Sequence, residues 1–200
     1  MLPLISTNAI AGVIFLAACL VWIAPEVIGT FRQTARTARR TAIVHDRGSL
    51  GVLLALQWLG LALSFALAWA FPLAAIPWQR TALFALGVVA MLLGVAIRWY
   101  AIKTLGAYFT RDVAVSVDQP VVQTGLYRLI RHPAYTGTFL TMLGVGLALE
   151  NWASLGALLL CVVLGHLYRA HVEEDALRQT IGQPYIEYMR RTKRFIPFVY

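Results

Sequence analysis

The chain has 200 residues, of which 60% are hydrophobic and only 13% are charged. Soluble globular proteins are about 45–50% apolar and about 25% charged, so a soluble fold of this size could not bury so much apolar surface. The composition therefore excludes an ordinary cytosolic enzyme, a disordered chain and a secreted disulfide scaffold. It indicates an all-α, polytopic membrane protein that forms a single integral membrane domain over residues 1–200.

The chain is basic, with a formal net charge of +8. Such a balance can indicate nucleic-acid binding. Here, Lys and Arg residues that flank membrane spans explain it better, and we expect no nucleic-acid partner. Cys19 and Cys161 both lie in apolar runs without metal-ligand spacing, so we expect neither a disulfide framework nor a metal.

Stretches without Asp, Glu, Lys or Arg predict five membrane-spanning helices, of which the third is long enough only if it continues through Arg98 to Ile102. Glu150 and Asn151 predict a tight turn that makes the last two spans a helical hairpin. Three spans then occupy residues 1–105, and residues 106–200 form the cofactor-binding and catalytic half with a cytoplasmic C-terminal helix. The five predicted spans are residues 1–25, 48–79, 81–97, 133–149 and 151–168.

The basic residues also predict an orientation. In the five-span arrangement all 17 Lys and Arg residues except Arg80 fall on one side of the membrane. The positive-inside rule then places the N-terminus outside and the C-terminus in the cytoplasm. The Ala- and Arg-rich composition and the short loops favour a bacterial inner membrane.

The densest group of polar and aromatic residues is 124–137, with the sequence TGLYRLIRHPAYTG. Pro133 suits the first turn of a helix, which places His132 at a helix start where free N–H groups favour an anion. Tyr127 and Tyr135 are suited to cover an aromatic ring or a cation. The alternative is an interfacial belt of aromatic and basic residues that anchors the fourth span.

A second polar group, residues 168–174, directly follows the fifth span. Arg169 and Glu173 share a helix face at i, i+4, which by itself is also typical of an intrahelical ion pair. Acidic side chains on a mostly basic side would attract a cationic ligand. Because the hairpin returns the chain to the same bilayer face, we expect the two polar groups to converge on one pocket. The basic run 190–194 favours contact with membrane lipids, or closure over that pocket.

At these residues the sequence resembles the isoprenylcysteine carboxyl methyltransferase family of integral membrane enzymes, whose wider group includes phospholipid N-methyltransferases. The resemblance covers about residues 106–197, nearly half of the chain. Each motif alone is weak, but the ordered set is fairly specific. The motif elements are residues 125–127, 131–137, Arg169 with 173–174, 182–185 and 194–197.

The resemblance implies S-adenosylmethionine as methyl donor and a lipophilic small molecule or a prenylated peptide, with an isoprenylcysteine carboxylate, as acceptor. It assigns the acceptor to Arg169 as the catalytic residue. It carries no indication of an oligomeric state, and membrane lipids are the expected surroundings. The cofactor-binding residues that it implies are Gln119, Val122, Tyr127, His132, Pro133, Ala134, Tyr135, Glu173 and Glu174.

Elementary chemistry agrees with this assignment. Glu173 can bind the donor's ammonium group, and His132 or helix N–H groups can bind its carboxylate. A carboxylate acceptor needs alignment but no general base, whereas an amine acceptor would need one, with His132, His171 or a Glu as candidates. The alternatives are a phospholipid N-methyltransferase, a nicotinamide-dependent sterol-type membrane reductase, and a non-catalytic membrane scaffold.

Overall fold

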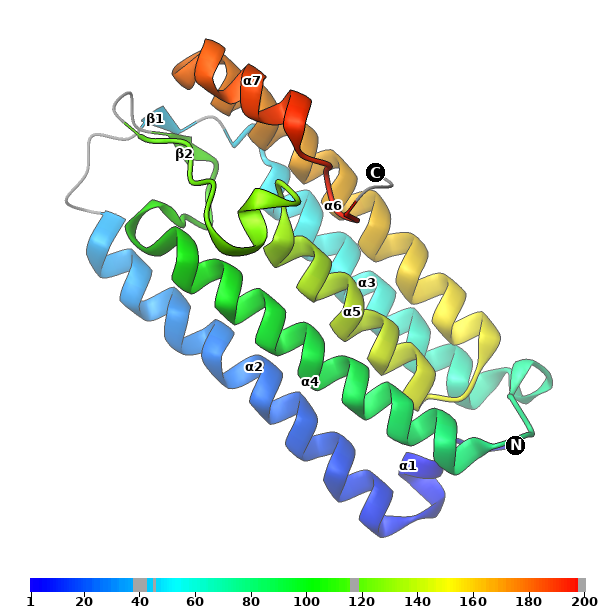
Figure 1. The fold of residues 1–200 in the computed structure, drawn as a ribbon. Helices are drawn as coiled ribbons and strands as arrows, with labels where there is room; N and C mark the ends of the chain where they lie inside the picture. The colour runs from blue at the N-terminus through cyan, green and yellow to red at the C-terminus, as the bar shows by residue number, and fades with distance from the viewer. Residues whose placement is uncertain (38–42, 45, 116–118, 198–200) are drawn as a thin grey trace.

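The computed structural model describes residues 1–37, 43–44, 46–115 and 119–197, with side chains described outside residues 30–45. It is built almost entirely from helices (Figure 1). The elements are α1 (Leu4–Thr7), α2 (Ala9–Thr37), β1 (Ile43–Val44), α3 (Ser49–Ala70), η1 (Pro72–Ala74), α4 (Arg80–Leu105), η2 (Gly106–Tyr108), β2 (Ala114–Val115), η3 (Gly125–Arg128), α5 (Pro133–Ala148), α6 (Trp152–Ile181) and α7 (Gln183–Arg191).

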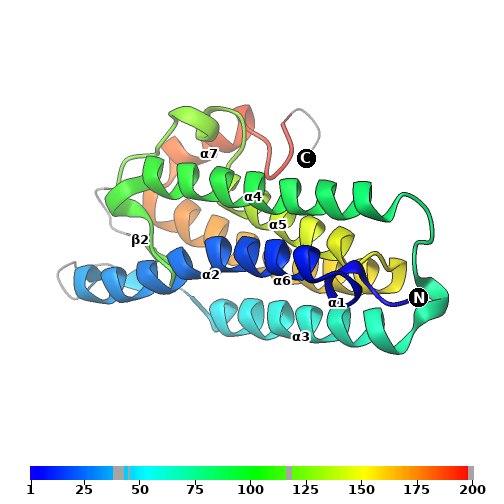
Figure 2. The same cartoon turned by 90° about the horizontal axis from the view of Figure 1, so that it is seen from below.

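The long helices form one bundle in which the spatial order differs from the chain order. Helix α3 packs on α6, α6 on α5, α5 on α4, and α4 on α2 (Figures 1 and 2). Within the described residues, four helices are long and apolar enough to cross a membrane, which agrees with the membrane class predicted from composition. These segments are Ala9–Gly29, Ser49–Ala70, Arg80–Tyr108 and Trp152–Ile181.

Helix α5 leaves the predicted count of five spans unconfirmed. Its 16 residues correspond to about 24 Å at 1.5 Å per residue, less than the hydrocarbon thickness of about 30 Å. Ten of the 16 residues are buried, because α5 is enclosed between α4 and α6. The predicted hairpin is confirmed, since only Leu149–Asn151 separate α5 from α6. The predicted extension of α4 past Arg98 is confirmed as well.

Small residues let α4 and α5 approach closely along their whole contact. A Cβ atom added at Gly94 would lie 2.5 Å from the Gly137 carbonyl oxygen. At a second contact between the same two helices, a Cβ added at Gly87 would lie 2.7 Å from the Gly144 carbonyl oxygen. Helices in membranes associate through such close backbone contact, because lipid offers no hydrophobic driving force between them. The glycines therefore fix the position of α5 against α4.

One end of the bundle is held by a buried carboxylate in the hairpin turn. Glu150 has a left-handed backbone with φ of 53°, and Asn151 caps α6 by accepting a hydrogen bond from the Ser154 N–H. The Glu150 carboxylate lies 2.6 Å from the Arg80 guanidinium and accepts the Leu4 N–H at 3.3 Å. Through these contacts, the Glu150 carboxylate holds the N-terminal segment, the start of α4 and the hairpin turn together at one end of the bundle (Figure 1).

The opposite end is where α4 ends, α5 begins and α7 lies across the bundle (Figure 2). After α7 the chain runs back beside the segment before α5. The N–H groups of Arg131 and His132 donate to the carbonyl oxygens of Lys193 and Arg194 at 2.8 and 3.0 Å. We call residues 192–197 the C-terminal strap. This arrangement confirms a C-terminal helix and brings the last motif element against the residues around His132.

Candidate functional site

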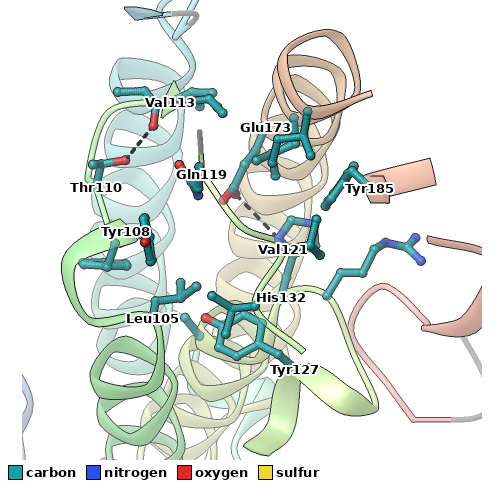
Figure 3. A pocket seen from close by; sticks show the side chains of 18 of the residues that line it. Leu105, Tyr108, Thr110, Val113, Gln119, Val121, Tyr127, His132, Glu173 and Tyr185 are labelled. Atoms are coloured by element: carbon teal, nitrogen blue, oxygen red, sulfur yellow. Dashed lines mark hydrogen bonds and ion pairs between the residues drawn. The ribbon is translucent and has the colours of Figure 1, made fainter. Parts of the chain in front are cut away.

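A cavity opens at this second end, between the connector after α4, the start of α5 and the last third of α6 (Figure 3). Its empty volume is about 890 Å³, and this figure includes space that is open to solvent. Tyr127 lies toward one end of the cavity and Glu173 and Tyr185 toward the other (Figure 3). The cavity is therefore open to solvent and offers polar, charged and aromatic side chains to a ligand.

The two polar groups predicted to converge do meet in this cavity. Pro133 and Glu174, also predicted as cofactor-binding residues, do not line it: Pro133 is buried in the first turn of α5, and Glu174 is buried behind the wall. The predicted residues that do line it are Gln119, Val122, Tyr127, His132, Ala134, Tyr135, Arg169 and Glu173.

Glu173 is a carboxylate of α6 that faces the cavity. Its Oε2 accepts a hydrogen bond of 2.7 Å from the Tyr135 hydroxyl and lies 3.5 Å from His132 Nδ1. The side chain remains 33% exposed, so part of the carboxylate is open to a ligand. Figure 3 shows Glu173 and His132 facing each other, joined by the dashed line. The arrangement offers a negative charge, held in a fixed direction, to a positively charged ligand group.

Two tyrosines of the wall, Tyr127 and Tyr188, are neutral at neutral pH. Burial raises the pKa of Tyr127, and the nearby Glu173 carboxylate raises it further. Burial likewise raises the pKa of Tyr188 to about 12, although Arg131 and Thr192 oppose it. The Tyr188 hydroxyl donates a 2.7 Å hydrogen bond to the Tyr127 carbonyl oxygen. These rings are therefore uncharged, partly apolar surfaces suited to a flat ring system.

Arg169 lines the cavity, but its guanidinium already has several partners. It donates to Asp46, to the Ser49 hydroxyl at 2.6 Å and to the Arg111 carbonyl oxygen. Burial would raise the pKa of Asp46, but the Leu50 N–H and the Arg169 charge outweigh it, so the pKa lies below its usual value. Arg169 thus joins α6 to the start of α3 and to the connector after α4.

The second arginine of the wall, Arg131, is paired with a carboxylate as well. Its Nε lies 2.8 Å from Glu174 Oε1, and the Arg194 guanidinium lies 2.6 Å from Glu174 Oε2. His132 Nε2 lies 3.1 Å from the same Glu174 Oε1. Glu174 is therefore the centre of a buried ionic cluster directly behind His132. Of this cluster, Arg131 and His132 line the cavity.

Several wall residues were not predicted as site residues. In the connector after α4 only Gln119 and Val122 were predicted as site residues, yet this connector supplies a whole side of the cavity. The signal available in the sequence was its aromatic pair, Tyr108-Phe109, in a polar segment. Asp46 was missed because its loop reads as a plain basic linker. Besides Gln119 and Val122, and Leu105 at the end of α4, the connector residues in the wall are Tyr108, Phe109, Thr110, Asp112, Val113, Ala114, Val115, Pro120 and Val121.

The comparison with family models decides the relationship. Residues 85–179 match the model of the isoprenylcysteine carboxyl methyltransferase (ICMT) family. The family resemblance is thereby established for this segment. The matched segment runs from within α4 to near the end of α6, and it contains both polar groups, the hairpin and most of the cavity wall.

The chain is also similar to individual proteins that are named as isoprenylcysteine O-methyltransferases. The chain is 31% identical over 117 residues to protein-S-isoprenylcysteine O-methyltransferase B of Arabidopsis thaliana, covering 56% of this chain and 58% of the relative. It is 34% identical over 116 residues to the Saccharomyces cerevisiae protein-S-isoprenylcysteine O-methyltransferase, covering 57% of this chain and 48% of that protein.

The fold comparison extends over a larger part of the chain. A solved structure of the eukaryotic intramembrane Ras methyltransferase ICMT is similar with a TM-score of 0.58 and 30% identity. The match covers 74% of this chain and 52% of that one. The chain thus spans less than two thirds of the length of these relatives, and the shared part is the ICMT-like membrane fold.

Proposed function

We propose that the chain transfers a methyl group from S-adenosylmethionine to the carboxylate of an isoprenylcysteine-like or other lipophilic acceptor at the membrane. The observation that carries the proposal is Glu173, a partly open carboxylate that is fixed by Tyr135 in the wall of a solvent-accessible cavity. Relatives that match this half of the chain are named as isoprenylcysteine O-methyltransferases.

The chemistry of the wall fits the donor part by part. The ammonium group suits Glu173, and the adenine suits the neutral face of Tyr127 with the apolar Val122 beside it. Gln119 adds an amide that can both donate and accept. The donor's sulfonium also gains from a wall whose open charge is negative. These residues would hold the donor without a metal ion.

When bound, S-adenosylmethionine supplies a methyl group on a positively charged sulfur. A bond forms between the acceptor carboxylate oxygen and the methyl carbon as the bond from that carbon to sulfur breaks, leaving a neutral thioether. The chain's task is to align the two reactants and exclude water, because the carboxylate is already ionised at neutral pH. No residue of the wall has to remove a proton.

For the acceptor we propose Arg169. It lies in the cavity wall on the same face of α6 as Glu173, one helical turn before it. Its contacts with Asp46 and Ser49 hold the guanidinium in a fixed direction. A guanidinium can bind a carboxylate in fixed geometry, and sharing its charge with Asp46 moderates the pull on the nucleophilic oxygen.

The charge of the wall argues against the nicotinamide-dependent reductase. The pyrophosphate of such a cofactor requires cationic partners. Both arginines that line the cavity are paired with carboxylates, Arg131 with Glu174 and Arg169 with Asp46. Glu173 would in addition repel a phosphate. The pattern of charges favours a cationic ligand over a dianionic one.

The proposal is tested by calorimetric titration of the detergent-purified protein with S-adenosylmethionine and, separately, with a reduced nicotinamide cofactor. We expect S-adenosylmethionine to bind and Glu173→Gln to weaken that binding by about ten- to a hundredfold, the effect of losing one charged hydrogen bond. The matched control is Glu187→Gln, which changes an exposed carboxylate of α7.

Methyl transfer is then measured with a farnesylated cysteine derivative that has a free carboxylate, and with its methyl ester as a blocked control. Activity on the free carboxylate alone supports the proposed acceptor. Binding of the nicotinamide cofactor in place of S-adenosylmethionine would overturn the proposal. Methylation of a phospholipid amine with no activity on the carboxylate would replace the acceptor.

We further propose the orientation. Arg80 lies at the end of the bundle that holds the N-terminal segment and the hairpin turn, whereas Arg111, Arg128 and the α7 arginines lie at the cavity end (Figure 1). The positive-inside rule places the cavity end in the cytoplasm, where the donor would enter. A cysteine-labelling experiment tests this: a Cys placed at Gln183 should react with impermeant maleimide only after the membrane is opened.

A further inference from the structure

We propose that Glu174 does not touch the donor but positions His132, so that the imidazole presents an unprotonated Nδ1 to the cavity beside Glu173. The two glutamates are neighbours in the sequence and have opposite places in the structure. Glu173 is partly open and faces the cavity, whereas the Glu174 side chain has an exposed fraction of 0%. Glu174 therefore acts through the residues that surround it.

Three cationic or N–H-bearing side chains converge on Glu174. Arg131 donates to Oε1 at 2.8 Å, and Arg194 donates to Oε1 at 3.2 Å and to Oε2 at 2.6 Å. His132 Nε2 lies 3.1 Å from Oε1. The Glu174 carboxylate thus has two guanidinium partners besides the imidazole.

The contact with Glu174 decides which ring nitrogen of His132 carries the proton. An ionised carboxylate only accepts hydrogen bonds, so the nitrogen facing it, Nε2, must be the donor. In the neutral ring the other nitrogen, Nδ1, is then an acceptor. Nδ1 lies 3.5 Å from Glu173 Oε2. Two acceptors are thus placed side by side at the cavity wall.

The ring cannot turn to exchange its nitrogens without breaking this packing. Tyr135 stacks on His132 with ring centroids 5.1 Å apart, and Phe195 of the C-terminal strap packs against it at 5.8 Å. The strap is itself fixed, because the Thr136 hydroxyl donates to the Phe195 carbonyl oxygen at 2.7 Å. Arg194 and Phe195 therefore hold Glu174 and His132 from the same side, away from the cavity.

Two acceptors beside each other form a site for a ligand group with several N–H donors, such as an ammonium. This step rests on the proposed function, in which the donor's ammonium binds at Glu173. It also reverses the role expected from the sequence, where His132 would donate to the donor's carboxylate. In the proposed arrangement, His132 Nδ1 accepts a hydrogen bond from the ammonium group. The contact with Glu174 determines that Nδ1 is the accepting nitrogen.

The first test is nitrogen-15 NMR of the imidazole groups in the detergent-solubilised, ligand-free wild-type protein. The chain has four histidines, and a His132→Gln variant assigns the signal of interest. We expect the neutral form of His132 with the proton on Nε2. A neutral ring with the proton on Nδ1 would overturn the proposal. This measurement needs neither a ligand nor a Glu174 variant that folds.

The second test compares Glu174→Gln with Glu174→Asp. The Gln amide can offer the ring an oxygen or an NH₂ group, so we expect the His132 signal to show both tautomers and S-adenosylmethionine affinity to fall about tenfold. Glu174→Asp keeps the charge and should restore the Nε2–H tautomer and part of the affinity. The matched control is Asp175→Asn, which removes the next carboxylate of α6, paired with Arg178 at the surface.

A folded Glu174→Gln variant with wild-type affinity and an unchanged His132 tautomer would contradict the positioning role. The two proposals can be separated. If the wild-type protein fails to bind S-adenosylmethionine, the proposed function fails, while the imidazole signals still report whether Glu174 sets the tautomer. If the wild-type protein binds but the tautomer is wrong, only the positioning role fails.

Discussion

The two ends of the bundle each contain a buried carboxylate paired with arginine, and they differ in what surrounds the pair. Glu150, with an exposed fraction of 2%, bonds to Arg80 and to the backbone of the N-terminal segment. Glu174, fully buried at the other end, bonds to Arg131 and Arg194 behind the wall of a cavity. The first pair closes a turn; the second supports a surface that a ligand can reach.

The difference shows that a buried ion pair does not by itself mark a functional site. Desolvation offsets much of the attraction in such pairs, so their presence says little about either stability or function. What distinguishes the cavity end is the neighbouring Glu173, which stays 33% exposed and has fixed partners. If the two ends act separately, a change at Glu150 should alter stability, whereas a change at the cavity should alter ligand binding.

The largest effect is expected for Glu150→Ala. The change leaves the Arg80 guanidinium, 18% exposed, without its carboxylate and releases the N-terminal segment, which should cost about 3 kcal/mol or more of stability. We expect a lower thermal unfolding midpoint in detergent with an unchanged dissociation constant for S-adenosylmethionine in the folded protein. Glu187→Ala, at an exposed site, serves as control. A tenfold weaker donor affinity would show that the two ends are coupled.

A smaller loss of stability is expected for Gly94→Val. This change tests the close contact between α4 and α5, which connects the two ends of the bundle. The added Cβ would lie 2.5 Å from both the Gly137 carbonyl oxygen and the Thr141 nitrogen, and overpacking of this kind costs about 1–3 kcal/mol. Gly156→Val provides the control, since a Cβ there meets nothing within 4 Å. Equal unfolding midpoints for the two variants would contradict the close contact of α4 with α5.

Arg169→Lys is expected to lower turnover more than it weakens donor binding. Lysine keeps the charge beside Asp46, but it lacks the planar fork that aligns a carboxylate. We expect methyl transfer to fall about tenfold while the donor's dissociation constant stays within about twofold. The paired control is Arg178→Lys on the exposed side of the same helix. Wild-type turnover in Arg169→Lys would remove Arg169 from acceptor binding.

The smallest effect is a pH dependence at Asp46. Because its pKa is lower in the folded protein, Asp46 adds stability above the ordinary Asp pKa of about 3.9 and loses it as the pH falls below that value. We expect Asp46→Asn to unfold at a lower temperature than wild type at pH 7. The gap between the two midpoints should narrow as the pH falls toward 3. A gap that widens in acid would reverse the assigned direction.

Much of this protein could be predicted from sequence because the relevant signals are local. Runs of apolar residues locate the helices, since a membrane-crossing helix requires a long stretch without charge. Glu150 and Asn151 predict the hairpin turn. Because the hairpin returns the chain to the same bilayer face, the polar group before its first helix is predicted to meet the polar group at the end of its second helix. The motif residues lead to the family over the segment that the family model matches.

Tertiary structure decided the points that depend on direction and on distant partners. Arg169 was predicted beside Glu173 on one helix face, but its carboxylate partner is Asp46, more than 120 residues earlier in the chain. Helix α5 was predicted to span because its composition is apolar; its short length is compensated by burial between α4 and α6. Neither fact follows from local sequence, since each depends on what the fold brings alongside.

The clearest case is the pair Glu173 and Glu174. The sequence determined that two adjacent glutamates, Glu173 and Glu174, follow the fifth apolar run, and it assigned both to the same ligand. Successive residues on an α-helix point about 100° apart, because the helix has 3.6 residues per turn. Only the packing of α5 and the C-terminal strap against α6 decided that Glu173 faces the cavity, while Glu174 faces Arg131 and Arg194 behind it.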